Sequence, residues 1–265
     1  MSVALRHYRP VVRSLLRGIF PVEGGSPMIL VMATTGAAET VTIPCQNVGT
    51  FDASIDWGDG TTTTVLAYNS AGLAHEFADI GDHTITITGT FPNIYFNNVG
   101  DKLKVKEVVQ LGKVGLIRLT GAFYGCTNLT SLSSGVTDTS NVTDTQNMVR
   151  GCSGLVDPDV STIDTSSVAN FGNMFREITA ANDVIGLDLF DISSATSLSL
   201  ILHGSTILTS RYDAVLIAWE AQTVASGLSV SFGSSQYTPG GAAEQARTDL
   251  INNDLWTIVD GGPVP

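Results

Sequence analysis

The chain has 265 residues, enough for one large domain or two small ones, and 43% of them are apolar. Only 14% are charged, and the formal net charge at pH 7 is −12. All 25 acidic residues, but only nine of the 13 basic ones, lie after residue 18, so this body should repel nucleic acid and anionic membranes. The composition excludes a disordered chain and is typical of β-rich extracellular or virion proteins.

Residues 1–26 form a basic arm whose apolar and basic positions follow helical spacing. The apolar stripe and the adjoining arginines are Leu5, Tyr8, Val12 and Leu16, and Arg6, Arg9, Arg13 and Arg17. We expect this arm to dock on a larger assembly; a membrane-surface helix and a frayed tail are the alternatives. Because the arginines interrupt any apolar signal core, we expect no ordinary secretion. The sequence contains no run of 18 apolar residues, so it predicts no transmembrane segment.

Residues 27–100 predict a β-sandwich, because short β-branched runs alternate with turns. The runs are Met28–Met32, Thr40–Ile43, Phe51–Trp57 and His83–Thr88. Asp56-Trp57-Gly58-Asp59-Gly60, followed by four threonines, predicts a strand, a tight turn and a second strand. Asp56 and Asp59 are weak candidates for binding Ca²⁺; the alternative is that their carboxylates accept bonds from turn amides.

Residues 101–208 contain a repeat with a step of 26 residues. Gly125-Cys-Thr-Asn-Leu129 returns as Gly151-Cys-Ser-Gly-Leu155, and Asp138-Thr-Ser-Asn-Val142 returns as Asp164-Thr-Ser-Ser-Val168. A period of this length with fixed apolar positions predicts a solenoid of four stacked coils. A leading strand over Lys102–Val108, in which lysines alternate with apolar residues, is expected before the first coil.

The last two coils are irregular in sequence. Glu177–Ala181 replaces the Gly-Cys-x-x-Leu phrase, Asp191–Ser194 fits the repeat only after a shift of one residue, and His203 replaces a glycine. Terminal coils commonly depart from the consensus because they cap the stack.

Side chains one repeat apart should stack on each other. For Cys126 and Cys152 this predicts a buried, inert ladder, and with Cys45 the chain has no disulfide framework. For Asp138 and Asp164, joined by Asp191, it predicts turn caps, with a Ca²⁺ strip or a receptor-facing ridge as alternatives.

Asp157 and Asp159 flank Pro158 in a predicted exposed loop. Two carboxylates beside a sugar-binding groove are the minimum for glycoside hydrolysis, but nothing in the sequence fixes their separation or raises the pKa of one of them.

Residues 209–265 predict an α/β cap that covers the open end of the solenoid. Ser210 is the expected N-cap of a helix whose apolar face comprises Tyr212, Val215, Leu216 and Trp219. Next come a predicted strand at Leu228–Phe232, a helix from Thr238-Pro239 through Leu250, and a strand at Trp256–Val259.

The middle of the chain resembles the BspA-like leucine-rich-repeat surface proteins. The residues that carry this resemblance are Gly121–Leu129, Asp138–Met148, Asp164–Val168 and Asn173–Phe175. The Trp57-Gly-Asp-Gly60 turn and the run from His75 to Ile87 resemble a polycystic-kidney-disease-type (PKD-like) immunoglobulin sandwich, which often precedes the repeats in that family. The closing pattern, from the Trp219 helix to Asp260-Gly-Gly262, resembles the end of tailed-bacteriophage structural and fibre proteins.

These resemblances imply a mainly β protein, with a PKD/Ig-like sandwich, a short leucine-rich-repeat-type solenoid and a small α/β C-terminal cap. We expect a non-enzymatic virion protein of a bacteriophage or phage-like particle, of the fibre, spike or decoration type. It would form a homo-oligomer or be present in several copies per particle, and be assembled in the host cytoplasm. The arm would bind other virion proteins, and the solenoid would bind a host glycan or protein. A BspA-type adhesin on the bacterial cell surface and a virion-associated glycan depolymerase are the alternatives.

The candidate receptor face consists of polar and aromatic residues of the coils and the cap: Tyr124, Asn128, Asp138, Asn141, Asp164 and Tyr237. The sequence contains no Gly-x-Ser-x-Gly elbow, phosphate loop or His-Glu-x-x-His helix. We therefore expect no catalytic residue, and no cofactor beyond the Ca²⁺ alternative.

Overall fold

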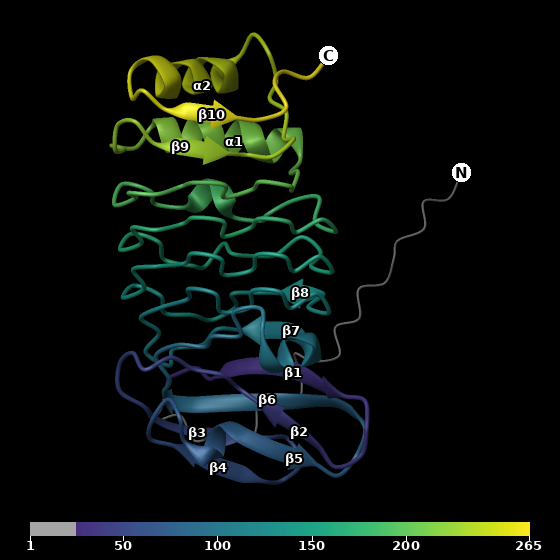
Figure 1. The fold of residues 1–265 in the computed structure, drawn as a ribbon. Helices are drawn as coiled ribbons and strands as arrows, with labels where there is room; N and C mark the ends of the chain where they lie inside the picture. Colours follow the sequence, from purple (N-terminus) through teal and green to yellow (C-terminus); the bar gives the residue numbers. More distant parts are fainter. Residues whose placement is uncertain (1–24) are drawn as a thin grey trace, which may run out of the picture.

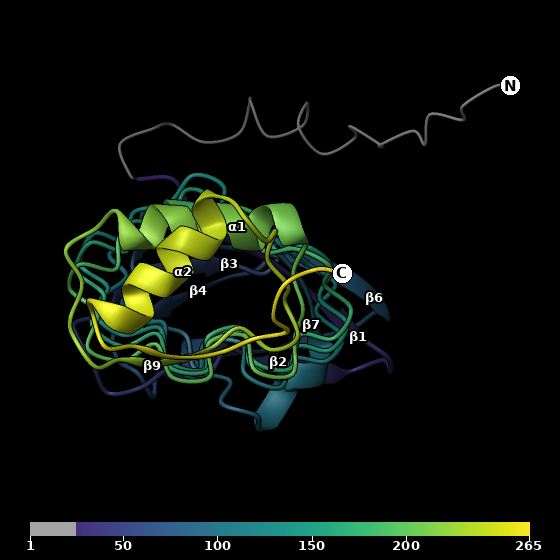
Figure 2. The ribbon, with the colours of Figure 1, turned by 90° about the horizontal axis from the view of Figure 1, so that it is seen from above.

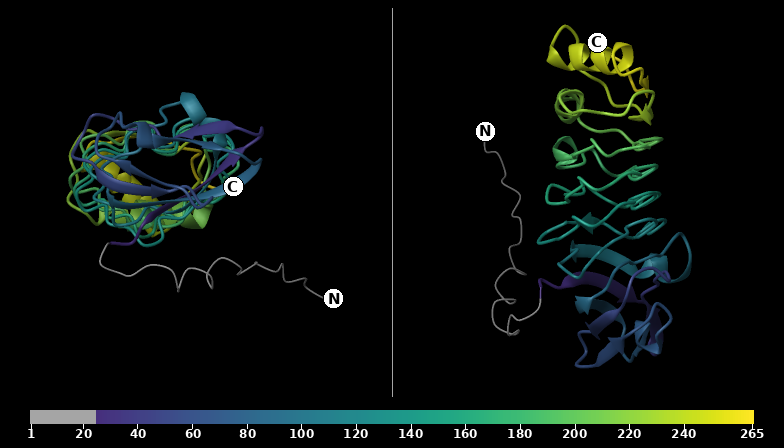
Figure 3. Two further views of the ribbon diagram at one scale, coloured as in Figure 1. Left: turned by 90° about the horizontal axis from the view of Figure 1, so that it is seen from below. Right: turned by 90° about the vertical axis from the view of Figure 1, so that its left-hand side faces the viewer.

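The protein is mainly β. A computed structural model describes residues 25–265, and within them it contains ten β-strands, two α-helices and three short 3₁₀-helices. The described chain forms a column with antiparallel strands at one end and the two α-helices at the other (Figure 1, Figure 3). None of the helices within residues 25–265 has the length and apolar character needed to cross a lipid bilayer.

Most of the predicted arm lies outside the described residues. This holds for its apolar stripe and for its arginines, so the docking role stays a prediction; the residues concerned are Leu5, Arg6, Tyr8, Arg9, Val12, Arg13, Leu16 and Arg17.

Two sheets form the N-terminal end of the column. Their strands are β1 (Met28–Thr34), β2 (Glu39–Thr42), β3 (Asp52–Asp56), β4 (Thr62–Val65), β5 (Ala74–Phe77), β6 (Gly81–Thr90), β7 (Val105–Gln110) and β8 (Ser131–Leu132). Six of them form one sheet in the order β4-β3-β6-β1-β7-β8, while β2 and β5 pair separately and antiparallel. The predicted strand-turn-strand around Gly58-Asp59-Gly60 is confirmed, because β3 and β4 pair antiparallel across it.

Aromatic rings join the two sheets. The Phe77 ring of β5 stacks on the His83 ring of β6, with centroids 3.6 Å apart, and lies 6.1 Å from the ring of Trp57. Trp57 is fully buried, and its indole Nε1 donates a hydrogen bond to Thr63 Oγ1 at 2.9 Å. Large rings bury much apolar area, so Trp57 fixes the β3–β4 turn on the core.

Strand β7 connects this end to the coils. It pairs antiparallel with β1 and parallel with β8, so one sheet runs across the boundary expected at residue 100. The leading strand was expected from Lys102, but residues Gly100–Lys104 form a 3₁₀-helix and the strand begins at Val105. That part of the prediction is wrong: a 3₁₀ turn, in which the ammonium of Lys104 reaches back to Asp101, takes the place of the alternating pattern.

The repeat appears in space as successive passes of the chain, here called coils, stacked on one another. Equivalent backbone groups bond from coil to coil: Gly121 N donates to Gln146 O at 2.7 Å, Asn147 N to Gly172 O at 2.9 Å and Asn173 N to Ser199 O at 2.9 Å. The apolar positions of the repeat are buried in every coil, as Phe123, Val149 and Phe175 illustrate; one extra residue puts Leu202, which is also buried, at this position in the last coil. We number the coils 1 (117–142), 2 (143–168), 3 (169–195) and 4 (196–208), and the shift of one residue expected near Asp191 lengthens coil 3.

Each coil turns a corner with two residues in the left-handed region. The positions are Gly121, Asn147, Asn173 and Leu200, and, four residues later, Gly125, Gly151, Glu177 and Gly204. Glycine and asparagine tolerate positive φ, whereas Glu177 at +62° and Leu200 at +56° each cost about 1–2 kcal/mol. The prediction that His203 replaces the repeat glycine is wrong: after the one-residue shift Gly204 holds that position, and His203 aligns with Arg176.

The cap continues the stack. It comprises α1 (Thr209–Glu220), β9 (Ser229–Ser231), α2 (Ala242–Asn252) and β10 (Thr257–Val259). Val230 of β9 bridges in parallel to Leu198 of coil 4, and β10 pairs parallel with β9. Figure 2 shows α1 along one side of the column and β9 along the opposite side. The cap is thus built as further coils in which a helix replaces part of the turn structure.

Two predicted helix starts in the cap are wrong. Ser210 does not cap α1, because the helix begins at Thr209 after Leu208, without a side-chain cap. Helix α2 begins at Ala242, since Pro239 and Gly240 form a turn before it. The predicted apolar face of α1 is confirmed: Tyr212, Val215, Leu216 and Trp219 are its buried residues.

Candidate functional site

The acidic column of the coils consists of capped turns. In each of three coils one aspartate Oδ1 accepts bonds from the amide and hydroxyl of the serine two residues later. The serine hydroxyl bond is 2.7 Å at Asp138, 2.6 Å at Asp164 and 2.6 Å at Asp191. Each carboxylate therefore holds its own turn, which agrees with the capping interpretation.

Hydrogen bonds and neighbouring charge shift the pKa values of the first two carboxylates. The Ser140 hydroxyl lowers the pKa of Asp138, and the Ser166 hydroxyl lowers the pKa of Asp164. The charge of Asp138 acts in the opposite direction on the pKa of Asp164, as expected for like charges one coil apart. Asn141 is exposed beside this column.

The two Ca²⁺ candidates also hold a turn. Asp56 Oδ1 accepts a bond from Gly58 N at 2.9 Å, and Asp59 Oδ1 accepts one from Thr61 Oγ1 at 2.6 Å. Asp59 Oδ2 lies 2.7 Å from His75 Nε2. The Thr61 hydroxyl and then His75 hold the pKa of Asp59 at about 2. Within residues 25–265, no three His, Cys, Asp or Glu side chains are grouped so that they could hold a metal ion.

The other acidic and thiol candidates have structural partners. Asp157 Oδ1 accepts bonds from the Asn182 and Asp183 amides at 2.8 and 3.0 Å, and Asp159 Oδ1 accepts the Ser161 hydroxyl at 2.6 Å. These bonds commit both carboxylates to fixing the backbone.

Both coil cysteines are free and buried. Cys152 Sγ bonds to Phe123 O at 3.0 Å, and burial raises the pKa of Cys152 to about 12. A thiol with such a pKa stays protonated at neutral pH and is unreactive.

The predicted receptor face does not form one surface. Asn128 is exposed, but its Nδ2 donates to Leu103 O at 2.7 Å, so it ties coil 1 to the turn before β7. Tyr237 is only 7% exposed and lies under the guanidinium of Arg247, whose carbon is 5.3 Å from the ring centroid. The prediction of Tyr237 as a surface contact is wrong, because the chain end pairs over it through Pro263.

Tyr124 belongs to a column that the sequence reasoning missed. One position in each coil carries Tyr124, Arg150, Arg176 and His203, which we call the basic column. Their backbones are stacked: Gly125 N donates to Arg150 O at 2.8 Å, Gly151 N to Arg176 O at 2.8 Å and Glu177 N to His203 O at 3.0 Å. The signal was the same 26-residue step, which brings these residues into register once the extra residue of coil 3 is counted.

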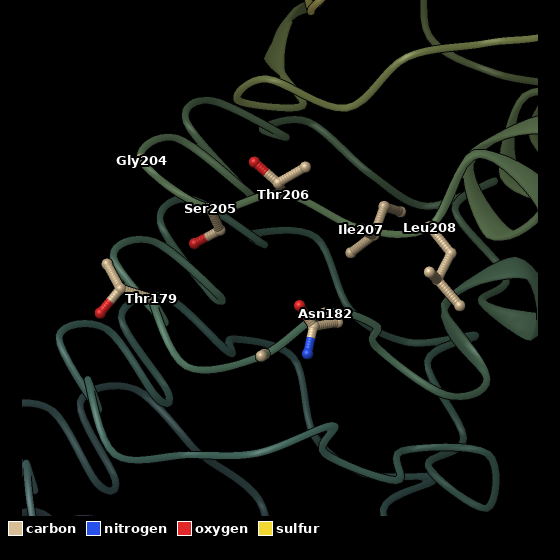
Figure 4. A pocket seen from close by; sticks show the side chains of 8 residues that line it. Thr179, Asn182, Gly204, Ser205, Thr206, Ile207 and Leu208 are labelled. Carbon is tan, nitrogen blue, oxygen red and sulfur yellow. The ribbon is translucent and has the colours of Figure 1, made fainter.

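A shallow pocket of about 290 Å³ opens between coils 3 and 4 (Figure 4). Ala181 occupies the position held by Leu129 and Leu155 in coils 1 and 2. Because alanine is smaller than leucine, less side-chain volume fills the inner wall of coil 3. Its lining is polar and uncharged, with an aliphatic rim, and comprises Thr179, Ala181, Asn182, Gly204, Ser205, Thr206, Ile207 and Leu208. Such a lining suits a hydroxyl-rich ligand and supplies no acid, base or nucleophile pair for catalysis.

Comparison with known proteins gives one similarity. A family model described as "Mycoplasma protein of unknown function, DUF285" matches residues 117–237, slightly less than half of the chain. The matched segment begins with coil 1 and ends in the cap. No curated protein matches the chain, and no solved structure matches it.

Proposed function

We propose that the chain is a non-enzymatic attachment protein of a bacteriophage or phage-like particle. The N-terminal arm binds other virion proteins, and the coils bind a glycan or protein on the host surface. In this proposal the coils are a leucine-rich-repeat solenoid of the BspA type, and the N-terminal sheets are a PKD-like module that acts as a spacer.

The observation that carries the proposal is the stacking of exposed polar side chains in register. The acidic column and the basic column both run along successive coils, and the pocket lies in the same stack. An extended surface built from repeated positions suits recognition of a polymer or a large partner better than conversion of a small substrate. Contacts of this kind are individually weak, and several copies on one particle multiply their effect.

The place where the arm joins the body supports a docking role. Lys113 N donates to Ser26 O at 2.6 Å, and Gln110 Nε2 donates to Pro27 O at 2.6 Å. The chain before Ser26 therefore joins the body beside β7, at the opposite end of the coils from the cap. An anchor at this junction leaves coils 3 and 4 and the pocket free to face a cell.

A bacterial cell-surface adhesin is the second candidate. The similarity of residues 117–237 to a family described from Mycoplasma favours it, because it relates the coils to a protein of a cell. The two candidates share the binding role of the coils and differ in what carries them.

Fractionation separates the two. Particles purified on a density gradient from cultures that make the protein should contain it, as detected by mass spectrometry. A variant lacking residues 1–20 should fold but be absent from the particles. Detection of the protein in the cell envelope alone, or undiminished incorporation of the shortened variant, would contradict the virion role.

A second assay tests the non-enzymatic claim. Incubation of the purified protein with host polysaccharide should release no new reducing ends. Their appearance in proportion to protein concentration would show a depolymerase instead.

A further inference from the structure

The basic column is an isolated region of positive charge on an acidic protein. Coils 1 to 4 contain only three Lys or Arg residues, and two of them, Arg150 and Arg176, stack one coil apart. Neighbouring strands lie about 4.8 Å apart, so two like charges at this spacing repel each other. Burial in a core does not account for the pair, because both side chains remain about a quarter exposed, at 26% and 23%.

The two guanidinium groups are held in similar orientations. Arg150 Nη1 lies 3.5 Å from Asn147 Oδ1, and Arg176 Nη1 donates to Asn173 Oδ1 at 3.3 Å. Both asparagines occupy the left-handed corner position of their coils. The Arg150 guanidinium carbon lies 5.0 Å from the centroid of the Tyr124 ring, a cation–π distance. Asparagine and tyrosine thus preorganise the pair, and preorganised donors lose less entropy when a ligand binds.

The pair has donors left for another anion. Glu177 Oε1 accepts a hydrogen bond from Arg176 Nε at 3.0 Å and lies 3.0 Å from Arg176 Nη2, while Glu177 Oε2 is 3.9 Å from Arg150 Nε. Arg150 Nε, although covered from solvent, has no hydrogen-bond partner. One carboxylate that is 45% exposed therefore serves two guanidinium groups, and it satisfies only one of them.

Glu177 itself occupies an unfavourable place. It stands at the corner position that is glycine in the other three coils, with φ of +62°. Its carboxylate lies between the guanidinium groups, where the carboxylate of a ligand would bind. Because Glu177 is exposed and its contact to Arg150 is long, a ligand carboxylate can displace it and form a two-pronged bond with Arg150.

From this geometry we propose that the basic column binds the carboxylate groups of an acidic polysaccharide, with Arg150 and Arg176 as the principal contacts. This proposal rests on the function proposed above and names the class of host ligand. Tyr124 and His203 extend the contact to the neighbouring coils, and His203 adjoins the pocket through Gly204. The more distant acidic residues oppose binding little at physiological salt, where charges are screened beyond about 8 Å.

The full-length protein can be tested by calorimetry with sodium polygalacturonate, with dextran as the neutral polymer and dextran sulfate as a non-carboxylate polyanion. Wild type should bind polygalacturonate, and the affinity should fall as salt rises. The double variant Arg150→Gln/Arg176→Gln should bind at least about tenfold more weakly. Arg118→Gln, in coil 1 but outside the column, is the matched control and should bind as wild type does.

Glu177→Gln tests the same idea in the opposite direction, so a loss of folding cannot imitate the result. Removing the competing charge should tighten polygalacturonate binding by about threefold to tenfold. The proposal is overturned if polygalacturonate does not bind at low salt, if the double variant binds as wild type does, or if Glu177→Gln weakens binding. Equal, salt-sensitive binding of dextran sulfate that ignores the double substitution would show non-specific polyanion attraction instead.

Attachment to host cells distinguishes this inference from the proposed function. If wild type and the double variant attach to cells equally well, the attachment role stands and the basic column is not the site. If wild type binds polygalacturonate through these arginines but does not attach to cells, the column is a polysaccharide site and the attachment role fails.

Discussion

The regular coils 1 and 2 and the irregular region from coil 3 onward are built on the same backbone ladder but differ in how it is filled. Coils 1 and 2 have Gly125 and Gly151 at the corner and Leu129 and Leu155 on the inner wall. Coil 3 has Glu177 and Ala181 at these positions. Glu177 places a carboxylate between two arginines, and the small side chain of Ala181 leaves the pocket open. The repeat consensus therefore maintains the stack, whereas the departures from it create the ion cluster around Glu177 and the pocket.

A substitution in the C-terminal cap should have the largest effect on the free energy of unfolding. Asp260 is 4% exposed, and it accepts bonds from Arg247 Nε at 2.7 Å and from Tyr212 Oη at 2.6 Å. Arg247→Met leaves this carboxylate buried without its counter-charge and should lower the free energy of unfolding by about 3–5 kcal/mol. Thermal and denaturant unfolding would measure it.

The matched control lies in coil 3. Arg176→Met removes an ion pair to Glu177, which is 45% exposed, and should cost only about 0–1 kcal/mol. Equal effects of the two substitutions would contradict the claim that the buried position of Asp260 makes its ion pair the more stabilising of the two.

Substitutions on the inner wall of the coils should have the next largest effect on stability. Leu155→Ala in coil 2 opens a cavity in a fully buried position and should cost about 2–5 kcal/mol. The reverse change in coil 3, Ala181→Leu, restores the regular pattern and should fill the pocket with a stability change under about 1.5 kcal/mol. A crystal structure of Ala181→Leu in which the pocket keeps its size would show that the alanine is not its cause.

A substitution at the corner position should have a smaller effect, and it should stabilise the protein rather than destabilise it. Glu177→Gly restores the regular residue at φ of +62° and should stabilise the protein by about 1 kcal/mol, because glycine has no penalty there. Thr179→Gly, at a neighbouring position outside the left-handed region, is the control and should destabilise slightly. A lower melting temperature for Glu177→Gly would mean that its ion pair outweighs the strain.

Acid should reveal the smallest effect. The pKa of Asp59 is lowered from 3.8 to about 2, so the folded state favours the ionised carboxylate. Its stabilisation is present above pH 3.8 and is lost as the pH falls towards about 2. Asp59→Asn should make stability less dependent on pH in this range. The stability that acid removes should fall by well under about 1 kcal/mol, because the side chain is partly exposed. An unchanged slope would assign the acid sensitivity to other carboxylates, with Asp138 and Asp164 the next to test.

Much of the fold can be read from the sequence, because periodicity reports burial directly. The 26-residue step located the buried columns, and the helical spacing of Tyr212, Val215, Leu216 and Trp219 identified the buried face of α1. The first residues of the two helices were harder to predict. Neither N-cap residue, Leu208 or Gly241, makes a side-chain hydrogen bond, so the usual capping residues gave no reliable signal.

The candidate site was harder to predict, because it depends on tertiary neighbours. Tyr237 follows a turn and looks exposed in sequence, yet the chain end returns 26 residues later and covers it. The basic column could have been read from the repeat. Tyr124, Arg150 and Arg176 follow the plain 26-residue step, and only His203 needs the extra residue of coil 3 to come into register with them.

Competition for host cells tests the central claim most directly, namely that the coils are the attachment face of a particle. Purified protein lacking residues 1–20 is added to host cells before the particles, and the rate of particle adsorption is measured. The account predicts that adsorption falls as protein concentration rises, because the coils occupy the receptor without the arm. Particles that contain the protein but adsorb at an unchanged rate at saturating competitor would contradict it.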